Sequence, residues 1–178
     1  MLIMLEGADG SGKSTLYETL RKEFKHNFIK CLPRDDIGQY LWWKRKIENP
    51  CIYFVDRGFI SEWVYRPIKD DYQPNISLEE IGNLCSRNLF VVYCKNDNAY
   101  TNMKLRGDNY IVNNVEHKKI VERYEHVMNT LCWFTNCVAY PYNYETEGGL
   151  EFLLNRIKEF IEWRRKEWKG KDGPQMML

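Results

Sequence analysis

The sequence predicts an α/β fold, a doubly wound five-stranded parallel sheet flanked by helices, and two observations support it. The first is a set of short apolar runs that do not alternate with polar residues, which is typical of parallel strands covered on both faces. These runs occupy residues 1–5, 28–32, 51–55, 89–94 and 137–140. The second is a helical pattern in the segments between the runs, because strands that alternate with helices form a mostly parallel sheet.

The helical segments follow the strands in turn. They are expected over residues 14–24, 37–47 and 78–84, and around the apolar repeats at 120–131 and 150–161. Ser77 is a good N-cap with Glu80 three residues later, and it opens one of these helices. Ligands of such sheets bind at the carboxyl ends of the strands, so we look for site residues there.

Composition favours one soluble domain. The chain has 178 residues, 44% of them hydrophobic, and we expect a single domain over 1–170 with a disordered tail over 171–178. Lys and Arg number 26 against 25 Asp and Glu. The chain therefore lacks the basic balance of a protein that binds long stretches of nucleic acid. Phosphate binding should come from a focused site.

Cysteine usage and the first apolar run predict a cytoplasmic protein. The six cysteines form no CxxC pair and several fall in apolar runs, so we expect buried, reduced thiols. The first run is too short for a signal peptide or a membrane span, and no membrane partner is expected. A homodimer is compatible with the sequence.

The most specific motif is GADGSGKS at residues 7–14, which matches GxxxxGKS/T between a strand and a helix. The glycines let backbone N–H groups surround phosphate oxygens, and the helix start adds its positive dipole end. Lys13 should reach the β- and γ-phosphates, Ser14 should ligate Mg²⁺, and Thr15 should face the α-phosphate. The predicted ATP-binding residues are Gly7, Asp9, Gly10, Ser11, Gly12, Lys13, Ser14 and Thr15.

A second motif, Asp56-Arg57, follows the third apolar run. Asp56 would stand at the carboxyl end of a strand beside the phosphate loop, where it can hold Mg²⁺ or orient the acceptor. The forked charge of Arg57 suits an acceptor phosphate. The alternative is a surface ion pair that only ends the strand.

Three segments resemble thymidylate kinase, a nucleoside monophosphate kinase family. They are Leu5-Glu6-Gly7-Ala8-Asp9 running into the phosphate loop, Leu32-Pro33-Arg34, and the run from Asp56 and Arg57 through Ser61 to Tyr65. The resemblance covers roughly the first 65 residues in order, with looser similarity beyond. Two positions depart from it: Gly58 stands where the family carries a larger residue, and Arg66 where many members have Gln. The chain is also shorter between Arg66 and Leu78. These departures concern the acceptor base and leave phosphoryl transfer intact.

The resemblance implies an acceptor site. Asp9 would accept a hydrogen bond from the sugar 3′-hydroxyl, and Tyr65 would wall the 2′ side. Arg34 and Arg57 would bind the acceptor phosphate. Trp42 would stack on the base and Arg45 would contact it, although Trp42 could equally pack in the core.

Residues 95–114 are expected to form a lid that carries the catalytic arginine. Phosphoryl transfer needs positive charge on the migrating group, and the phosphate loop offers no basic residue besides Lys13. Arg106, beside Gly107, is the best candidate, and Lys104 is expected to be a solvated residue. The alternative for Arg106 is a solvated polar loop. His26, His117 and His126 are expected at the surface or as capping residues.

The sequence thus favours an ATP- and Mg²⁺-dependent kinase that phosphorylates a deoxynucleoside monophosphate, with a dTMP-like acceptor preferred. Lys13, Asp56 and Arg106 would be catalytic, and Ser14 and Asp56 would ligate the metal. The partners would be small-molecule nucleotides, and nucleic acid is not expected. Two alternatives stay open: a kinase of a hydroxyl on a deoxynucleoside or on a modified base in DNA, and a non-catalytic nucleotide-binding regulator.

Overall fold

A computed structural model describes residues 1–30, 36–69, 77, 79, 88–108, 111, 113–134 and 138–169. Its elements follow in the order β1 (Leu2–Glu6), α1 (Lys13–Glu23), β2 (Asn27–Lys30), α2 (Asp36–Glu48), β3 (Tyr53–Asp56), α3 (Phe59–Lys69), β4 (Leu89–Cys94), α5 (Ala99–Leu105), α6 (Asn114–Phe134), β5 (Val138–Tyr142) and α7 (Gly149–Lys169). No helix in these ranges is both long and apolar enough to cross a membrane.

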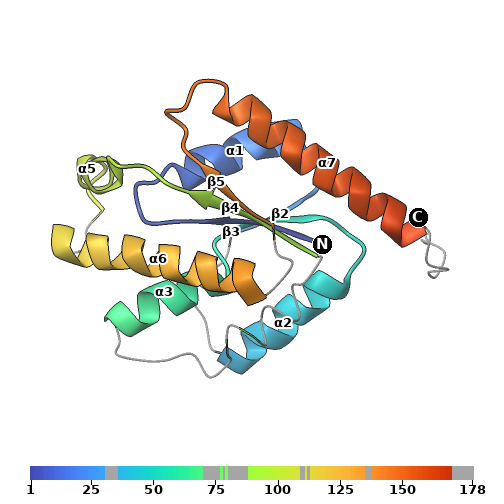
Figure 1. The fold of residues 1–178 in the computed structure, drawn as a ribbon, viewed down its shortest axis with the longest axis horizontal. Coiled ribbons are helices and arrows are strands. Elements are labelled where there is room, and N and C mark those ends of the chain that lie inside the picture. Colours follow the sequence, from blue (N-terminus) through green and yellow to red (C-terminus); the bar gives the residue numbers. More distant parts are fainter. Residues whose placement is uncertain are drawn as a thin grey trace.

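The five strands form one parallel sheet in the order β2-β3-β1-β4-β5 (Figure 1). This arrangement confirms the predicted fold class. The apolar runs form strands because both faces of the sheet are covered: α1 and α7 pack on one face, and α2, α3 and α6 on the other (Figure 1). Along β1, Leu2 and Met4 pack with the second group of helices, whereas Ile3 and Leu5 pack with the first.

Two helices of the structure were not predicted. Helix α3 contains Pro67, a residue that normally ends a helix or kinks it. The buried face of Ile60 and Val64 compensates, because tertiary packing supplies most of a helix's stability. Helix α5 has only seven residues, lies inside the predicted lid, and buries Ala99 and Met103.

The structure tests the predictions for the cysteines, the helix at 78–84 and the tail only in part. Cys51, Cys94 and Cys132 are unpaired, as expected for reduced thiols, but Cys51 and Cys132 are exposed and only Cys94 is buried. Of the predicted helix at 78–84 only Glu79 is described, and the tail at 171–178 lies outside the described residues.

Candidate active site

A cavity of about 330 Å³ opens beside the phosphate loop and the end of β3. Its walls bring together side chains from the loop, the end of β3 and the segment after α5. The lining residues are Asp9, Gly10, Gly12, Lys13, Ser14, Asp56, Arg57, Arg106 and Asp108. All three residues predicted to be catalytic therefore face one space. Thr15 does not line this cavity and is exposed.

Lys13 folds back onto the phosphate loop. Its Nζ donates to the carbonyl oxygens of Gly7 at 2.7 Å and Ala8 at 2.6 Å. Burial, followed by the nearby charge of Arg57, lowers the pKa of Lys13 to about 8. The ammonium group thus has internal acceptors, which phosphate oxygens could replace.

Two other segments, α5 and the segment after β5, pack against the phosphate loop. A Cβ at Gly10 would lie 1.8 Å from the carbonyl oxygen of Ala99 in α5, and Gly10 has a φ of +84°. A Cβ at Gly12 would lie 2.6 Å from the ring of Tyr144, which follows β5. The Tyr144 hydroxyl accepts a hydrogen bond from Asn102 Nδ2 at 2.8 Å. Glycine is required at both loop positions because neighbouring segments occupy the side-chain space.

Asp9, Arg57 and Tyr65 form what we call the acceptor cluster, and Asp9 and Arg57 line the cavity. Arg57 Nη2 donates to Asp9 Oδ1, and the Tyr65 hydroxyl donates to Asp9 Oδ2 at 3.0 Å. The Arg57 guanidinium lies 5.0 Å from the centre of the Tyr65 ring. Burial raises the pKa of the Tyr65 hydroxyl, which therefore stays a neutral donor. The resemblance placed these three residues in one acceptor site, and the structure brings them into contact.

Arg57 has an unusual backbone conformation. Its φ of 64° is the only positive value at a non-glycine residue among those described. Such conformations persist only where the surroundings impose them, and they occur often at functional sites.

Glu6, at the end of β1, lies beneath the turn that carries Arg57 and is 0% exposed. Its carboxylate accepts hydrogen bonds from the Gly58 N–H at 2.7 Å, from the Ser61 hydroxyl at 2.6 Å and from the Tyr124 hydroxyl at 3.3 Å. Burial raises its pKa to about 7, although Ser61, Arg57, Gly58 and Lys13 act in the opposite direction. We call Glu6, Gly58, Ser61 and Tyr124 the Glu6 network. The sequence signal was present, since Glu6 is a carboxylate that ends an otherwise apolar strand, but its partners are far away in sequence.

The expectation that all three histidines are surface or capping residues is wrong for His117. This side chain is 5% exposed, and its Nε2 lies 3.2 Å from the carbonyl oxygen of Asp9. Its ring also contacts the ring of Tyr100 edge-on. His117 on α6 thus ties that helix to the phosphate loop.

Arg106 lies at the end of α5 and faces the cavity with half of its side chain exposed. Its Nη2 lies 3.1 Å from Asp108 Oδ2. The two other basic candidates are directed elsewhere: Lys104 Nζ donates to the carbonyl of Ile111, and Arg123 Nε to that of Trp63. The geometry therefore favours Arg106 as the lid cation. Asp108, which the sequence reasoning missed, is its counter-charge.

Ser14 and Asp56 fit the role of Mg²⁺ ligands. Both supply oxygen donors to the cavity wall beside Lys13. The described residues contain no group of three His, Cys, Asp or Glu side chains that could hold a metal. That is compatible with Mg²⁺ in a phosphate site, because this ion is bound there by one or two protein oxygens, substrate phosphates and water.

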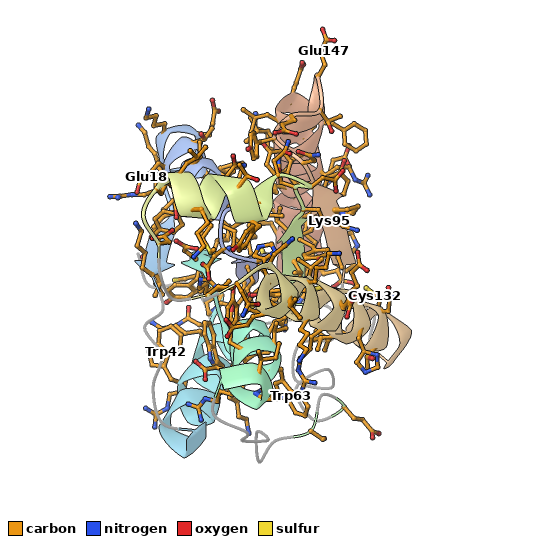
Figure 2. The ribbon with its side chains drawn as sticks, turned by 90° about the vertical axis from the view of Figure 1, so that its left-hand side faces the viewer. Glu18, Trp42, Trp63, Lys95, Cys132 and Glu147 are labelled. Atoms are coloured by element: carbon orange, nitrogen blue, oxygen red, sulfur yellow. The ribbon has the colours of Figure 1, made fainter. Side chains whose placement is uncertain are left out.

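The predicted base-contacting residues are not part of this cavity. Trp42 packs edge-on against Trp43, with ring centroids 4.6 Å apart, and Lys46 lies over its ring. Figure 2 shows Trp42 and Trp63 in the half of the molecule that holds α2 and α3, opposite Glu147. Arg45 is exposed, and Arg34 lies outside the described residues.

The two departures from the thymidylate kinase pattern have local explanations. A Cβ at Gly58 would lie 2.5 Å from the end of the Met4 side chain, so a larger residue there would require Met4 to move. Arg66 pairs with Glu62 one turn earlier on α3. Neither residue lines the cavity beside the phosphate loop.

Comparison with solved structures shows a similar fold in one nucleotide-bound protein and in two kinases. The YorR protein of Bacillus subtilis, in complex with phosphorylated GDP, has a TM-score of 0.72 and 23% identity over 89% of this chain and 96% of its own. Deoxyadenosine kinase of M. mycoides, with the products dCMP and dCDP, has a TM-score of 0.60 and 14% identity over 89% and 99%. Thymidylate kinase of Candida albicans has a TM-score of 0.55 and 15% identity over 92% of each chain.

No family model and no curated protein matches the chain. At these identities the structural comparisons establish a fold like that of the P-loop nucleoside monophosphate kinases. The thymidylate kinase resemblance therefore stays a prediction at the level of the family.

Proposed function

We propose that this protein is an ATP-dependent kinase that transfers the γ-phosphoryl group to a deoxynucleoside monophosphate, with a dTMP-like acceptor preferred. The observation that carries the proposal is the acceptor cluster beside the phosphate loop. Arg57 and Lys13 line the same cavity, so one cation is available for the triphosphate of ATP and one for the single phosphate of the acceptor. Two structural neighbours, a deoxyadenosine kinase and a thymidylate kinase, support a kinase of this class.

Each residue that lines the cavity has a different proposed role, according to its position. Lys13 would contact the β- and γ-phosphates, and Arg57 would bind the acceptor phosphate. Arg106 would neutralise charge on the migrating group while the triphosphate and the acceptor phosphate are aligned. Mg²⁺, held through Ser14 and Asp56, would screen the phosphate oxygens and orient them.

The sugar would contact the acceptor cluster. Asp9 offers carboxylate oxygens to a 3′-hydroxyl, while the Tyr65 ring stands beside the same carboxylate. Trp42 and Arg45 remain the residues proposed for the base, and Arg34 a second phosphate ligand, all from the family resemblance. Water would be displaced from a cavity of about 330 Å³ when both nucleotides bind.

A panel of acceptors tests this function. The purified protein is incubated with ATP and Mg²⁺, and ADP formation is measured with each dNMP, the matching NMP, the nucleosides, and single-stranded DNA with and without a hydroxymethylated base. We expect ADP only with dNMPs and the corresponding dNDP as product. Turnover of a nucleoside or of DNA instead would replace the proposal with a hydroxyl-directed kinase. ATP binding without turnover of any acceptor would make the protein a nucleotide-binding regulator.

A further inference from the structure

Glu6 fixes the turn that presents Arg57. The N–H of Arg57 donates to the carbonyl of Leu5 at 3.0 Å, and the next N–H, that of Gly58, donates to Glu6 Oε1 at 2.7 Å. Two successive peptide groups on either side of the Arg57 Cα are therefore tied to two successive residues of β1. The two attachments flank the residue with the positive φ, and such a conformation persists only where its surroundings impose it.

A second connection runs through Ser61. Its hydroxyl donates to Glu6 Oε2 at 2.6 Å, and Arg57 Nη1 lies 3.5 Å from the same hydroxyl oxygen. Tyr124 of α6 closes the group, with its hydroxyl 2.9 Å from Ser61 Oγ. Glu6 thus contacts the turn through the backbone and approaches the guanidinium through one intervening side chain.

We propose that Glu6 is a positioning residue for acceptor binding, holding Arg57 in the left-handed conformation that directs its guanidinium toward the cavity. The inference rests on the proposed function in one respect, since it takes Arg57 as the ligand of the acceptor phosphate. Glu6 itself contacts neither nucleotide in this arrangement, because it is fully buried and does not line the cavity.

Stability alone does not explain a carboxylate at this position. A buried ionisable group loses its hydration, and replacing such groups with well-packed apolar residues is often neutral or stabilising. The hydrogen bonds of Glu6 all go to the turn after β3, to α3 and to α6, the elements that frame Arg57. A geometric role for the carboxylate fits this distribution of bonds.

A double-mutant cycle tests the inference. Glu6→Leu removes the acceptor oxygens at similar volume, Arg57→Ala removes the guanidinium, and the double variant combines the two changes. Calorimetry gives the dissociation constant of ATP·Mg²⁺ and that of one deoxynucleotide. This deoxynucleotide is the one with the highest kcat/KM in the acceptor panel described above, and dTMP is measured first. We expect Glu6→Leu to weaken deoxynucleotide binding about tenfold or more in the parent, as for loss of one charge-assisted contact, and to have no effect in the Arg57→Ala background.

Three further variants make the result decisive. Glu6→Gln keeps an oxygen for the Gly58 N–H and should restore most of the affinity lost in Glu6→Leu. Ser61→Ala removes one link of the network and carries the test if Glu6→Leu does not fold. Tyr93→Phe is the matched control. The Tyr93 ring stacks on Tyr124, but Tyr93 itself is not a member of the Glu6 network. It should leave both dissociation constants unchanged.

The outcomes separate the inference from the proposed function. If the parent protein binds no deoxynucleotide, the proposed function fails. If the parent binds one, and the Glu6→Leu and Ser61→Ala changes act equally with and without Arg57, Glu6 does not act through Arg57 and the inference is overturned. An equal loss of ATP binding would also overturn it, because the effect would then be general damage to the fold.

Discussion

Arg57 of the acceptor cluster and Arg106, which follows α5, line the same cavity, but the two arginines are held differently. Arg57 is attached through its backbone to β1, pairs with Asp9 and contacts Tyr65. Arg106 ends a short helix, is half-exposed and pairs with Asp108, two residues away. In the proposed roles, Arg57 as the acceptor cation would therefore be positioned before substrate binds. Arg106, the proposed lid cation, would exchange Asp108 for phosphate at little energetic cost, since exposed ion pairs contribute roughly 0–1 kcal/mol.

The largest effect is expected from Arg106, because its charge would act mainly in the transition state. Arg106→Ala should lower kcat by about 10³-fold with both KM values nearly unchanged. Arg106→Lys should recover little, since a point charge does not replace the forked donors. Steady-state kinetics with each nucleotide varied in turn measures this.

Lys104→Ala and Arg123→Ala are the matched controls, because both side chains donate to backbone carbonyls away from the cavity. Each should turn over near the parent rate. If Arg123→Ala is inactive and Arg106→Ala is not, the cation comes from α6 and the contrast between the two regions is wrong.

Lys13→Ala should lower kcat by about 10²–10³-fold, the loss of one preorganised donor to a developing charge. This change tests the donor side of the cavity, because Lys13 is the cation assigned to ATP, whereas the two arginines are assigned to the acceptor and to the migrating group. Single-turnover assays and a thermal midpoint measured in parallel would show whether the loss is chemical or structural. Near-normal turnover would contradict the assignment of the phosphate loop.

Arg57→Ala should weaken binding of the deoxynucleotide by roughly 10–100-fold and leave ATP binding alone, as expected for loss of a charged hydrogen bond. Arg34→Ala should act in the same direction. Separate titrations of the two nucleotides test both changes. Should either one weaken ATP binding instead, the donor and acceptor sides are misassigned.

The last prediction concerns the pH dependence of stability rather than binding or turnover. Burial raises the pKa of Glu6 from 4.5 to about 7. Between these values the folded protein binds a proton that the unfolded chain has released, so this group makes the protein less stable as pH rises through the window, by on the order of 3 kcal/mol. Arg57 and Lys13 interact with Glu6; Arg57 stays charged throughout this window, and Lys13, with its pKa lowered to about 8, stays mostly charged.

Urea unfolding of the parent and of Glu6→Gln at about pH 5 and about pH 7 tests this. The parent should lose more stability than the variant over that interval. Glu122→Gln, a change at an exposed carboxylate of α6, is the control and should follow the parent. Identical pH profiles for all three proteins would mean that Glu6 does not titrate in this range.

The sequence predicted those features that are encoded locally. The phosphate loop was identifiable because Gly7, Gly12, Lys13 and Ser14 occur at fixed spacing in one short segment. The sheet was predictable because continuous apolar runs have few other uses in a chain of this size. Arg57 was predicted from its place after the third apolar run, and the acceptor roles of Asp9 and Tyr65 came from the family resemblance. The structure brings the three residues into contact.

The features that were missed depend on contacts between distant segments. Glu6 meets Gly58, 52 residues away, and Tyr124, 118 residues away. His117 meets the carbonyl of Asp9 across 108 residues. Periodicity carries no information on such pairings, so the buried roles of these residues could not be predicted. Helix α5 was missed for a related reason: it is short, and its buried residues Ala99 and Met103 pack against segments that are distant in sequence.

The left-handed backbone of Arg57 has a consequence for selection experiments. In a saturation library at position 57, a screen for folding should enrich Gly and Asn and deplete Val, Ile and Thr, since β-branched residues are strongly disfavoured at a positive φ. A screen for turnover should recover Arg from the same library. The two enrichment profiles would diverge at position 57, so sequencing both pools would measure how far foldability and catalysis compete at one residue.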